Sequence, residues 1–315
     1  MSLTKEQVNF SKFLTILALA YIVLILLLIG LMILSFPIGL YTVFITDLGR
    51  YSSIRGLFII FWFIYLVLFV KAIRGPRLPL NRIPRTALNY ELKSIFNNTL
   101  STLAVTFSAL LLITTFIELL QKSVGVETGS LHEIDPSFPI LLFISTTIAP
   151  IEEEIIFRVA TIGIVVILLL FIRGNHFNPF RVLWHPAKHV SELGKRADMK
   201  IIYFAIIISG ALFGFAHIAF GAGWEIGKVT TSSLAGIILG LIYFFYGFPG
   251  AVLLHWSFNY FLDSFYYFDI AVRESILSYF ADIVIITVGL ASILFLLIYA
   301  LQKIKAHNKQ VFLER

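Results

Sequence analysis

A run of 34 residues without a single charge, Phe13 to Thr46, constrains this chain more than any other feature. A transmembrane helix needs roughly 20 predominantly apolar residues, and this run exceeds that requirement. It is also too long for the apolar core of a signal peptide, and no small-residue cleavage site stands out. We therefore interpret the run as a first membrane helix that stays in place.

The composition of the whole chain fits a protein whose solvent is mostly lipid. Of its 315 residues, 59% are hydrophobic and 13% are charged, whereas soluble globular domains carry roughly 45–50% apolar and about 25% charged residues. The formal net charge is +6, but the basic residues gather in two loops and the tail, so we expect no nucleic-acid partner. The chain has no cysteine, which excludes disulfides, thiolate metal sites and cysteine-protease chemistry.

Apolar segments of membrane-spanning length recur along the chain, with no internal repeat or separate soluble domain. The sequence predicts an all-α, multi-pass membrane bundle in a single transmembrane domain, residues 1–315. The eight predicted helices are 13–36, 55–72, 97–118, 137–172, 201–222, 230–248, 249–266 and 280–302. The fourth is too long for one straight crossing at about 1.5 Å per residue, so we expect it to tilt, protrude or kink at Pro150.

The charges of the loops predict the orientation of the bundle. Loops 71–93 and 173–200 and the tail after residue 302 are basic, while loop 119–136 is acidic. The positive-inside rule places basic segments in the cytoplasm, and eight crossings then place both termini there. The predicted localisation is integral to the membrane with cytoplasmic termini, and we expect the functional cavity to open on the side of the basic loops.

Ionisable side chains within the apolar segments are the strongest sign of function. Insertion scales assign about 2.5–3.5 kcal/mol to a charged residue at the centre of a membrane helix. The fourth predicted helix nevertheless carries three consecutive glutamates, residues 152–154, and Arg158. Glu154 and Arg158 have the favourable i, i+4 order for an ion pair, but neighbours on a helix point about 100° apart. One arginine cannot serve all three carboxylates, so at least one glutamate must face a cavity or another partner.

Two histidines and an asparagine complete this polar set. His217 and His255 fall within predicted membrane helices, while the other five histidines lie in loops or the tail. His255 and Asn259 are spaced i, i+4, which predicts that both lie on one face of a helix. His185 and His189 suggest a metal pair, but no acidic ligand completes a site there, and we expect no metal at these residues.

Three motifs, in order along the chain, resemble the CPBP family of intramembrane proteases. Residues 153–158 match Glu-Glu-x-x-x-Arg, residues 213–217 match Phe-x-x-x-His, and residues 255–259 match His-x-x-x-Asn. The family comprises CAAX prenyl endopeptidases of the Ras-converting type, bacteriocin-processing proteins and their relatives. The resemblance covers residues 150–260 and implies an intramembrane endopeptidase with its catalytic helices at 137–266.

The resemblance and the chemistry of peptide hydrolysis together imply a role for each of these residues. Glu153, assisted by His217, is expected to position and deprotonate water. His255 and Asn259 are expected to donate hydrogen bonds to the tetrahedral oxyanion. Phe213 is interpreted as a packing residue. The expected partners are the lipid bilayer and a peptide or lipidated protein substrate, with prenylated C-terminal tails as one class.

Glu154 and Arg158 are expected to pair, to hold the helix and to tune the charge on Glu153. No cofactor is expected. One alternative is a zinc-dependent form of the same protease, because catalytic zinc often takes two histidines and a carboxylate. Asparagine is a poor fourth ligand, however, and the sequence lacks His-Glu-x-x-His. Two further alternatives are a transporter, for which no inverted repeat is visible, and a non-catalytic membrane scaffold.

Overall fold

The computed structural model describes residues 5–45, 52–74, 98–129, 139–192, 196–220, 223–273 and 276–313. These residues form helices and no strand, apart from one isolated bridge between Gly129 and Trp224. The predicted all-α, multi-pass class is therefore confirmed.

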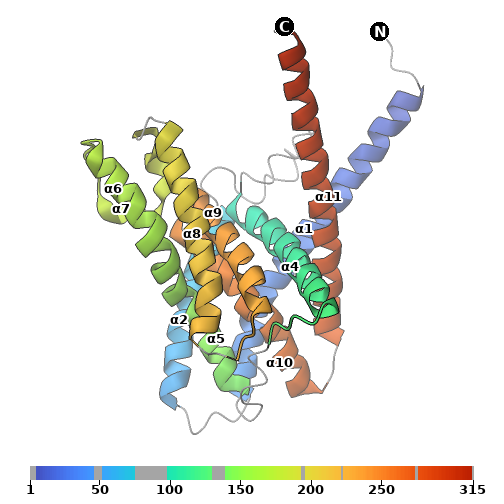
Figure 1. Cartoon of the computed structure of the whole chain (residues 1–315). Coiled ribbons are helices and arrows are strands. Elements are labelled where there is room, and N and C mark those ends of the chain that lie inside the picture. Colours follow the sequence, from blue (N-terminus) through green and yellow to red (C-terminus); the bar gives the residue numbers. More distant parts are fainter. Residues whose placement is uncertain are drawn as a thin grey trace.

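The described helices follow one another along the chain as Figure 1 shows. Before the polar motifs lie α1, α2 and α4 (Lys5–Ile45, Ser52–Arg74 and Thr99–Ser123). The first motif lies on a rod made of α5, η4 and α6 (Pro139–Glu154, Ile155–Gly163 and Ile164–Ile172), in which η4 has π-helical geometry. Two short helices, α7 and η5 (Pro179–Trp184 and Pro186–Glu192), lead to α8 (Arg196–Ala219). The last elements are α9, the π-helical η6, α10 and α11 (Gly227–Trp256, Ser257–Phe261, Leu262–Val272 and Ile276–Leu313).

Seven stretches of the described residues are long and apolar enough to cross a membrane. They are Leu19–Phe44, Gly56–Arg74, Thr99–Ser123, Leu142–Ile172, Asp198–Ala219, Gly227–Val272 and Ile276–Leu297. Six of them each coincide with one predicted helix, and Gly227–Val272 contains the two predicted helices 230–248 and 249–266. Its 46 residues would extend about 69 Å as one straight helix, more than twice the hydrocarbon core of a bilayer.

Gly247 divides this longest stretch into two antiparallel halves. Its backbone has φ 82° and ψ 177°, a conformation that glycine adopts and residues with a Cβ avoid. Gly236 and His255 lie on opposite sides of Gly247, yet each contacts the ion pair of Glu154 and Arg158. One continuous helix would separate Gly236 from His255 by about 28 Å. The chain therefore reverses at Gly247, next to the predicted boundary between residues 248 and 249.

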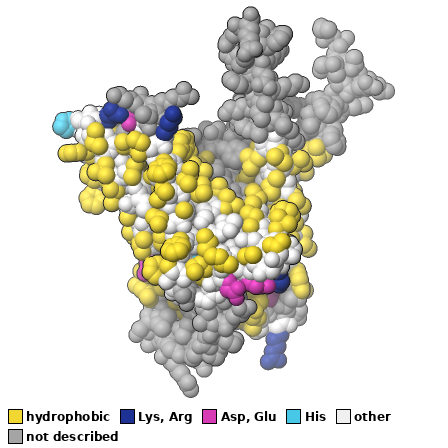
Figure 2. All heavy atoms as spheres, viewed as in Figure 1, with side chains coloured by type: hydrophobic (Ala, Val, Ile, Leu, Met, Phe, Trp, Pro, Cys, Tyr) yellow, Lys and Arg dark blue, Asp and Glu magenta, His cyan; other side chains and the backbone are white. Residues whose placement is uncertain are grey.

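With this reversal, the described chain crosses the bundle eight times. The N-terminal end of α1, the C-terminal end of α11 and the short α7 lie at one end of the molecule, here called the upper end (Figure 1). The connector after α4 and the connector before α9 lie at the opposite, lower end (Figure 1). Figure 2 shows hydrophobic side chains over most of the described surface between these ends, and charged side chains near the ends. This apolar belt is the surface that a lipid bilayer covers.

Glycines allow α8 to pack closely against the first half of α9. A Cβ added at Gly236 would lie 2.8 Å from the Cα of Gly210, and one added at Gly214 would meet the backbone of α9. Small residues spaced i, i+4 let membrane helices approach each other in this way. The contact fixes Phe213 and His217, on α8, beside the helices that carry the other polar motifs.

Candidate active site

The three consecutive glutamates at the end of α5 have three different environments. Glu152 is exposed, whereas the side chain of Glu153 is 33% exposed and that of Glu154 is 0% exposed. Successive residues on a helix point about 100° apart, so Glu154 enters the bundle and Glu153 lies at its edge. The wide turns of η4 begin directly after Glu154, and π turns inside helices are frequent at functional sites.

Glu154 forms an ion pair with Arg158, as the i, i+4 spacing predicts. The Nε of Arg158 lies 3.2 Å from Oε2 of Glu154, and both side chains are 0% exposed. The two atoms are within ion-pair distance but are not aligned as a hydrogen bond. The guanidinium carbon also lies 4.3 Å from the ring centroid of Phe213, and a terminal nitrogen donates to the carbonyl oxygen of Gly236 at 3.5 Å. This buried cation therefore connects η4 to α5, α8 and α9.

His255 lies between Glu153 and Glu154. Its Nδ1 is 2.8 Å from Oε1 of Glu154, and its Nε2 is 3.5 Å from Oε2 of Glu153. Because Glu154 is paired with a guanidinium, we take it as ionised, and an ionised carboxylate only accepts hydrogen bonds. Nδ1 of His255 therefore donates to Glu154. This bond orients the imidazole and leaves Nε2 facing Glu153.

The aromatic ring of Trp256 anchors the backbone beside His255. It is 1% exposed, with ring centroids 4.0 Å from Tyr260 and 4.8 Å from Tyr65. The hydroxyl of Tyr65, on α2, donates to the carbonyl oxygen of Thr147, on α5, at 2.9 Å. The stack thus links α2, α5 and the second half of α9. It fixes the position of His255 along the bundle axis relative to the glutamates.

His217 approaches this group across the ring of Phe213. The ring centroids of Phe213 and His217 are 4.8 Å apart, and those of Phe213 and His255 are 5.5 Å apart, both in edge-to-face geometry. Nδ1 of His217 donates to the carbonyl oxygen of Phe213 at 2.8 Å. In the neutral ring Nε2 then carries the lone pair and can accept a proton. Phe213 therefore packs against Arg158 and separates the two histidines.

Asn259 contacts a different part of α5. Its Nδ2 donates to the carbonyl oxygen of Thr146 at 3.2 Å. Thr146 precedes Pro150 by four residues, and proline has no N–H to offer that carbonyl. The chain stays α-helical through Pro150, and the change of geometry begins at Ile155 instead. Asn259 thus supplies the donor that Pro150 lacks.

The structure brings together most of the residues singled out in the sequence. Direct contacts join Glu153, Glu154, Arg158 and His255, and His217 lies beside them across one aromatic ring. Asn259 follows His255 by four residues but lies in the π turn of η6. The side-chain amide of Asn259 donates to Thr146 instead of contacting the glutamates. The link between Pro150 and Asn259 was missed in the sequence, although the spacing of Thr146 and Pro150 was a visible signal.

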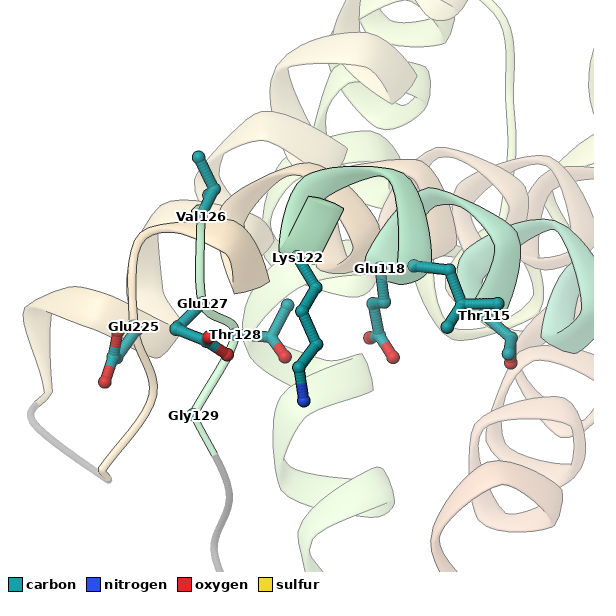
Figure 3. Close-up of a pocket in the computed structure, with 9 residues that line it drawn as sticks. Thr115, Glu118, Lys122, Val126, Glu127, Thr128, Gly129 and Glu225 are labelled. Carbon is teal, nitrogen blue, oxygen red and sulfur yellow. The ribbon is translucent and has the colours of Figure 1, made fainter. Parts of the chain in front are cut away.

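Two grooves of the described surface open at the lower end of the bundle. One, of about 470 Å³, lies between α4 and the two lower connectors and includes Glu118, Lys122 and Glu225 (Figure 3). The other, of about 810 Å³, lies between α10 and α11. Neither groove is lined by the motif glutamates or histidines. Among the described residues, no group of three or more His, Asp or Glu side chains is arranged to hold a metal ion.

Residues 135–261 match the family described as type II CAAX prenyl endopeptidase Rce1-like. The matched segment contains all three polar motifs. The class of protein is therefore an intramembrane peptidase, a hydrolase that acts on peptide substrates in a membrane. The predicted resemblance to the CPBP family is confirmed, and the chain is Rce1-like over this segment. Comparisons with curated proteins and with solved structures give no match.

Proposed function

We propose that this peptidase cleaves the C-terminal tail of its substrate with a water molecule that Glu153 activates. The different environments of the two neighbouring glutamates carry the proposal. Glu154 is fully buried and is bound to Arg158 and His255, whereas Glu153 keeps 33% of its side chain exposed beside Nε2 of His255. A carboxylate that meets water next to a histidine is suited to hold that water and remove its proton.

The proposed reaction needs only proton transfers and one tetrahedral intermediate. Glu153 takes a proton from water, and the hydroxyl oxygen bonds to the carbonyl carbon of the substrate. The lone pair on Nε2 of His217 shares that proton. Donation from Nε2 as well as Nδ1 requires His255 to carry a proton on both ring nitrogens, a form that the two adjacent carboxylates stabilise. Nε2–H of His255 and the second N–H of Asn259 then donate to the oxyanion. When the C–N bond breaks, the proton passes to the leaving nitrogen, which restores Glu153.

The surface of η4 supports a lipidated form of the substrate. Ile155 and Ile156 follow the glutamates directly, and they are 48% and 57% exposed. An isoprenyl chain attached near the cleaved bond would find apolar neighbours there and in the surrounding lipid. The description of the matched family names prenyl endopeptidases. A prenylated tail requires that the site face the compartment in which the tail is prenylated.

A pair of adjacent variants tests the role of Glu153. Purified full-length protein in detergent is incubated with a quenched fluorescent peptide that ends in a free carboxylate, with and without a prenyl group. Glu153→Gln keeps the shape of the side chain and should abolish cleavage, while Glu152→Gln, at the exposed neighbouring position, should cleave at the wild-type rate. Equal rates for wild type and Glu153→Gln would refute the proposed base.

A chelator separates the proposed mechanism from its zinc-dependent alternative. The glutamate mechanism predicts full activity after incubation with a strong zinc chelator. Loss of activity in chelator, followed by recovery on addition of zinc, would reassign Glu153, His217 and His255 as metal ligands.

A further inference from the structure

Lys228 places a half-buried cation at the lower edge of the site. It lies in the first turn of α9, and its Nζ is 3.9 Å from the ring centroid of Trp224. Among the described residues, no carboxylate lies within ion-pair distance of its ammonium, and Glu118 interacts with it electrostatically from farther away. The dipole of a helix disfavours a cation in its first turn. The dipole of α9 therefore does not explain this lysine.

The ring of Trp224 connects Lys228 to the catalytic histidine. The ring centroids of Trp224 and His217 are 6.2 Å apart. Because the ammonium of Lys228 is 3.9 Å from the same tryptophan, it lies at most about 10 Å from the ring of His217. Three residues of extended chain span about 10 Å. A peptide cleaved next to His217 can therefore place the end of a three-residue tail at Lys228.

We propose that Lys228 binds the C-terminal carboxylate of the substrate, three residues beyond the cleaved bond. The inference rests on the proposed function, since it places the cleaved bond beside Glu153 and His217. An ammonium and a carboxylate form a charge-assisted hydrogen bond, and the face of Trp224 holds the ammonium in position. Glu118, which interacts with Lys228, also lines the groove in Figure 3, so this groove leads to the neighbourhood of the lysine.

Wild-type protein alone gives the first test. Three peptides share one cleavage sequence: a three-residue tail with a free carboxylate, the same tail with a C-terminal amide, and a six-residue tail with a free carboxylate. The KM for the first should be about 10- to 100-fold lower than for the other two, as expected for one charge-assisted contact. Equal KM values for all three would overturn the role of Lys228 and leave the proposed function intact. Failure to cleave any peptide would contradict the proposed function itself.

Variants then assign the preference to one side chain. Lys228→Met keeps the apolar stem and removes the charge, so the KM for the carboxylate peptide should rise to that of the amide while cleavage of the amide stays unchanged. Lys122→Met, which removes a cation that lines the groove in Figure 3, should keep the wild-type preference. Lys228→Arg should retain most of it and provides a second variant if Lys228→Met does not fold. A preference that survives in Lys228→Met, or is lost equally in Lys122→Met, contradicts the proposal.

Discussion

Arg158 is the cation that makes a fully buried Glu154 tolerable. Arg158→Ala would leave that carboxylate without its ion pair in the interior of the bundle. Removing one partner of a buried pair costs about 3–5 kcal/mol, because the other charge stays desolvated. We expect a clear fall in folded yield and in the temperature of thermal unfolding, followed in detergent by tryptophan fluorescence.

A second arginine provides the matched control for this variant. Arg173 also pairs with an acid, Asp198, at 2.6 Å, but its side chain is 29% exposed. Asp198 is only 2% exposed, but loss of the partly exposed arginine opens it to water, so Arg173→Ala should lower the unfolding temperature less than Arg158→Ala. Similar shifts in the two variants would show that burial of the Glu154–Arg158 pair does not determine its importance.

Asn259 has two candidate roles, and a double variant separates them. As an oxyanion donor, Asn259→Ala should reduce turnover by about 10²–10³ and leave KM nearly unchanged. As a structural partner of Thr146, it would matter only while Pro150 withholds an N–H. Pro150→Ala restores that N–H, so we expect the Pro150→Ala/Asn259→Ala protein to stay as slow as Asn259→Ala. Recovery to the rate of Pro150→Ala alone would assign Asn259 a purely structural role.

At the scale of the helices, Gly247 makes the reversal that carries His255 back to the glutamates. A Cβ at this position would lie 2.5 Å from the carbonyl oxygen of Trp184, and the φ of 82° strains any residue other than glycine. Strain of this kind costs about 1–3 kcal/mol before the collision is counted. Gly247→Ala should therefore lower both the unfolding temperature and the rate of cleavage.

Another glycine shows whether a methyl group alone has this effect. Gly30 lies within α1, with no atom within 4 Å of an added Cβ and no positive φ. Gly30→Ala should leave unfolding temperature and cleavage near the wild-type values, because alanine is the better helix former. Comparable damage at both positions would argue against a reversal that depends on glycine.

The membrane helices could be predicted from the sequence because a lipid environment requires long apolar segments, and the hydrophobicity of each residue is known from its type alone. The boundary between two helices near Gly247 could also be predicted, since this glycine and Pro249 lie close together inside one apolar stretch. The π turns of η4 and η6 could not be predicted, because their geometry depends on partners from other helices. For the same reason the i, i+4 spacing of His255 and Asn259 predicted one shared target, whereas the two side chains contact different parts of α5.

At the scale of the whole molecule, one side of the site extends towards the lower end of the bundle. His217 is two residues from the end of α8 and is close to Trp224, in the lower connector. The described residues of the basic segment 173–200 belong to the upper end. The sequence led us to expect a cavity that opens beside the basic loops. His217 lies towards the opposite end, whereas His255 is eight residues from Gly247, which lies beside Trp184 of the upper α7. His217 and the basic segment thus lie towards different ends of the bundle.

Labelling of single cysteines decides which end faces the cytoplasm, and the chain has no native cysteine to interfere. His176→Cys reports on the upper end and Glu225→Cys on the lower end, and both positions are exposed. Neither change removes a basic residue, so the positive-inside signal is preserved. That rule predicts that an impermeant maleimide labels Glu225→Cys in intact cells and labels His176→Cys only after permeabilisation. This result would place Lys228 and the groove in Figure 3 on the outer face, away from tails prenylated in the cytoplasm. The opposite pattern would contradict the predicted cytoplasmic termini and would place Glu153 and Lys228 where such a tail can reach them.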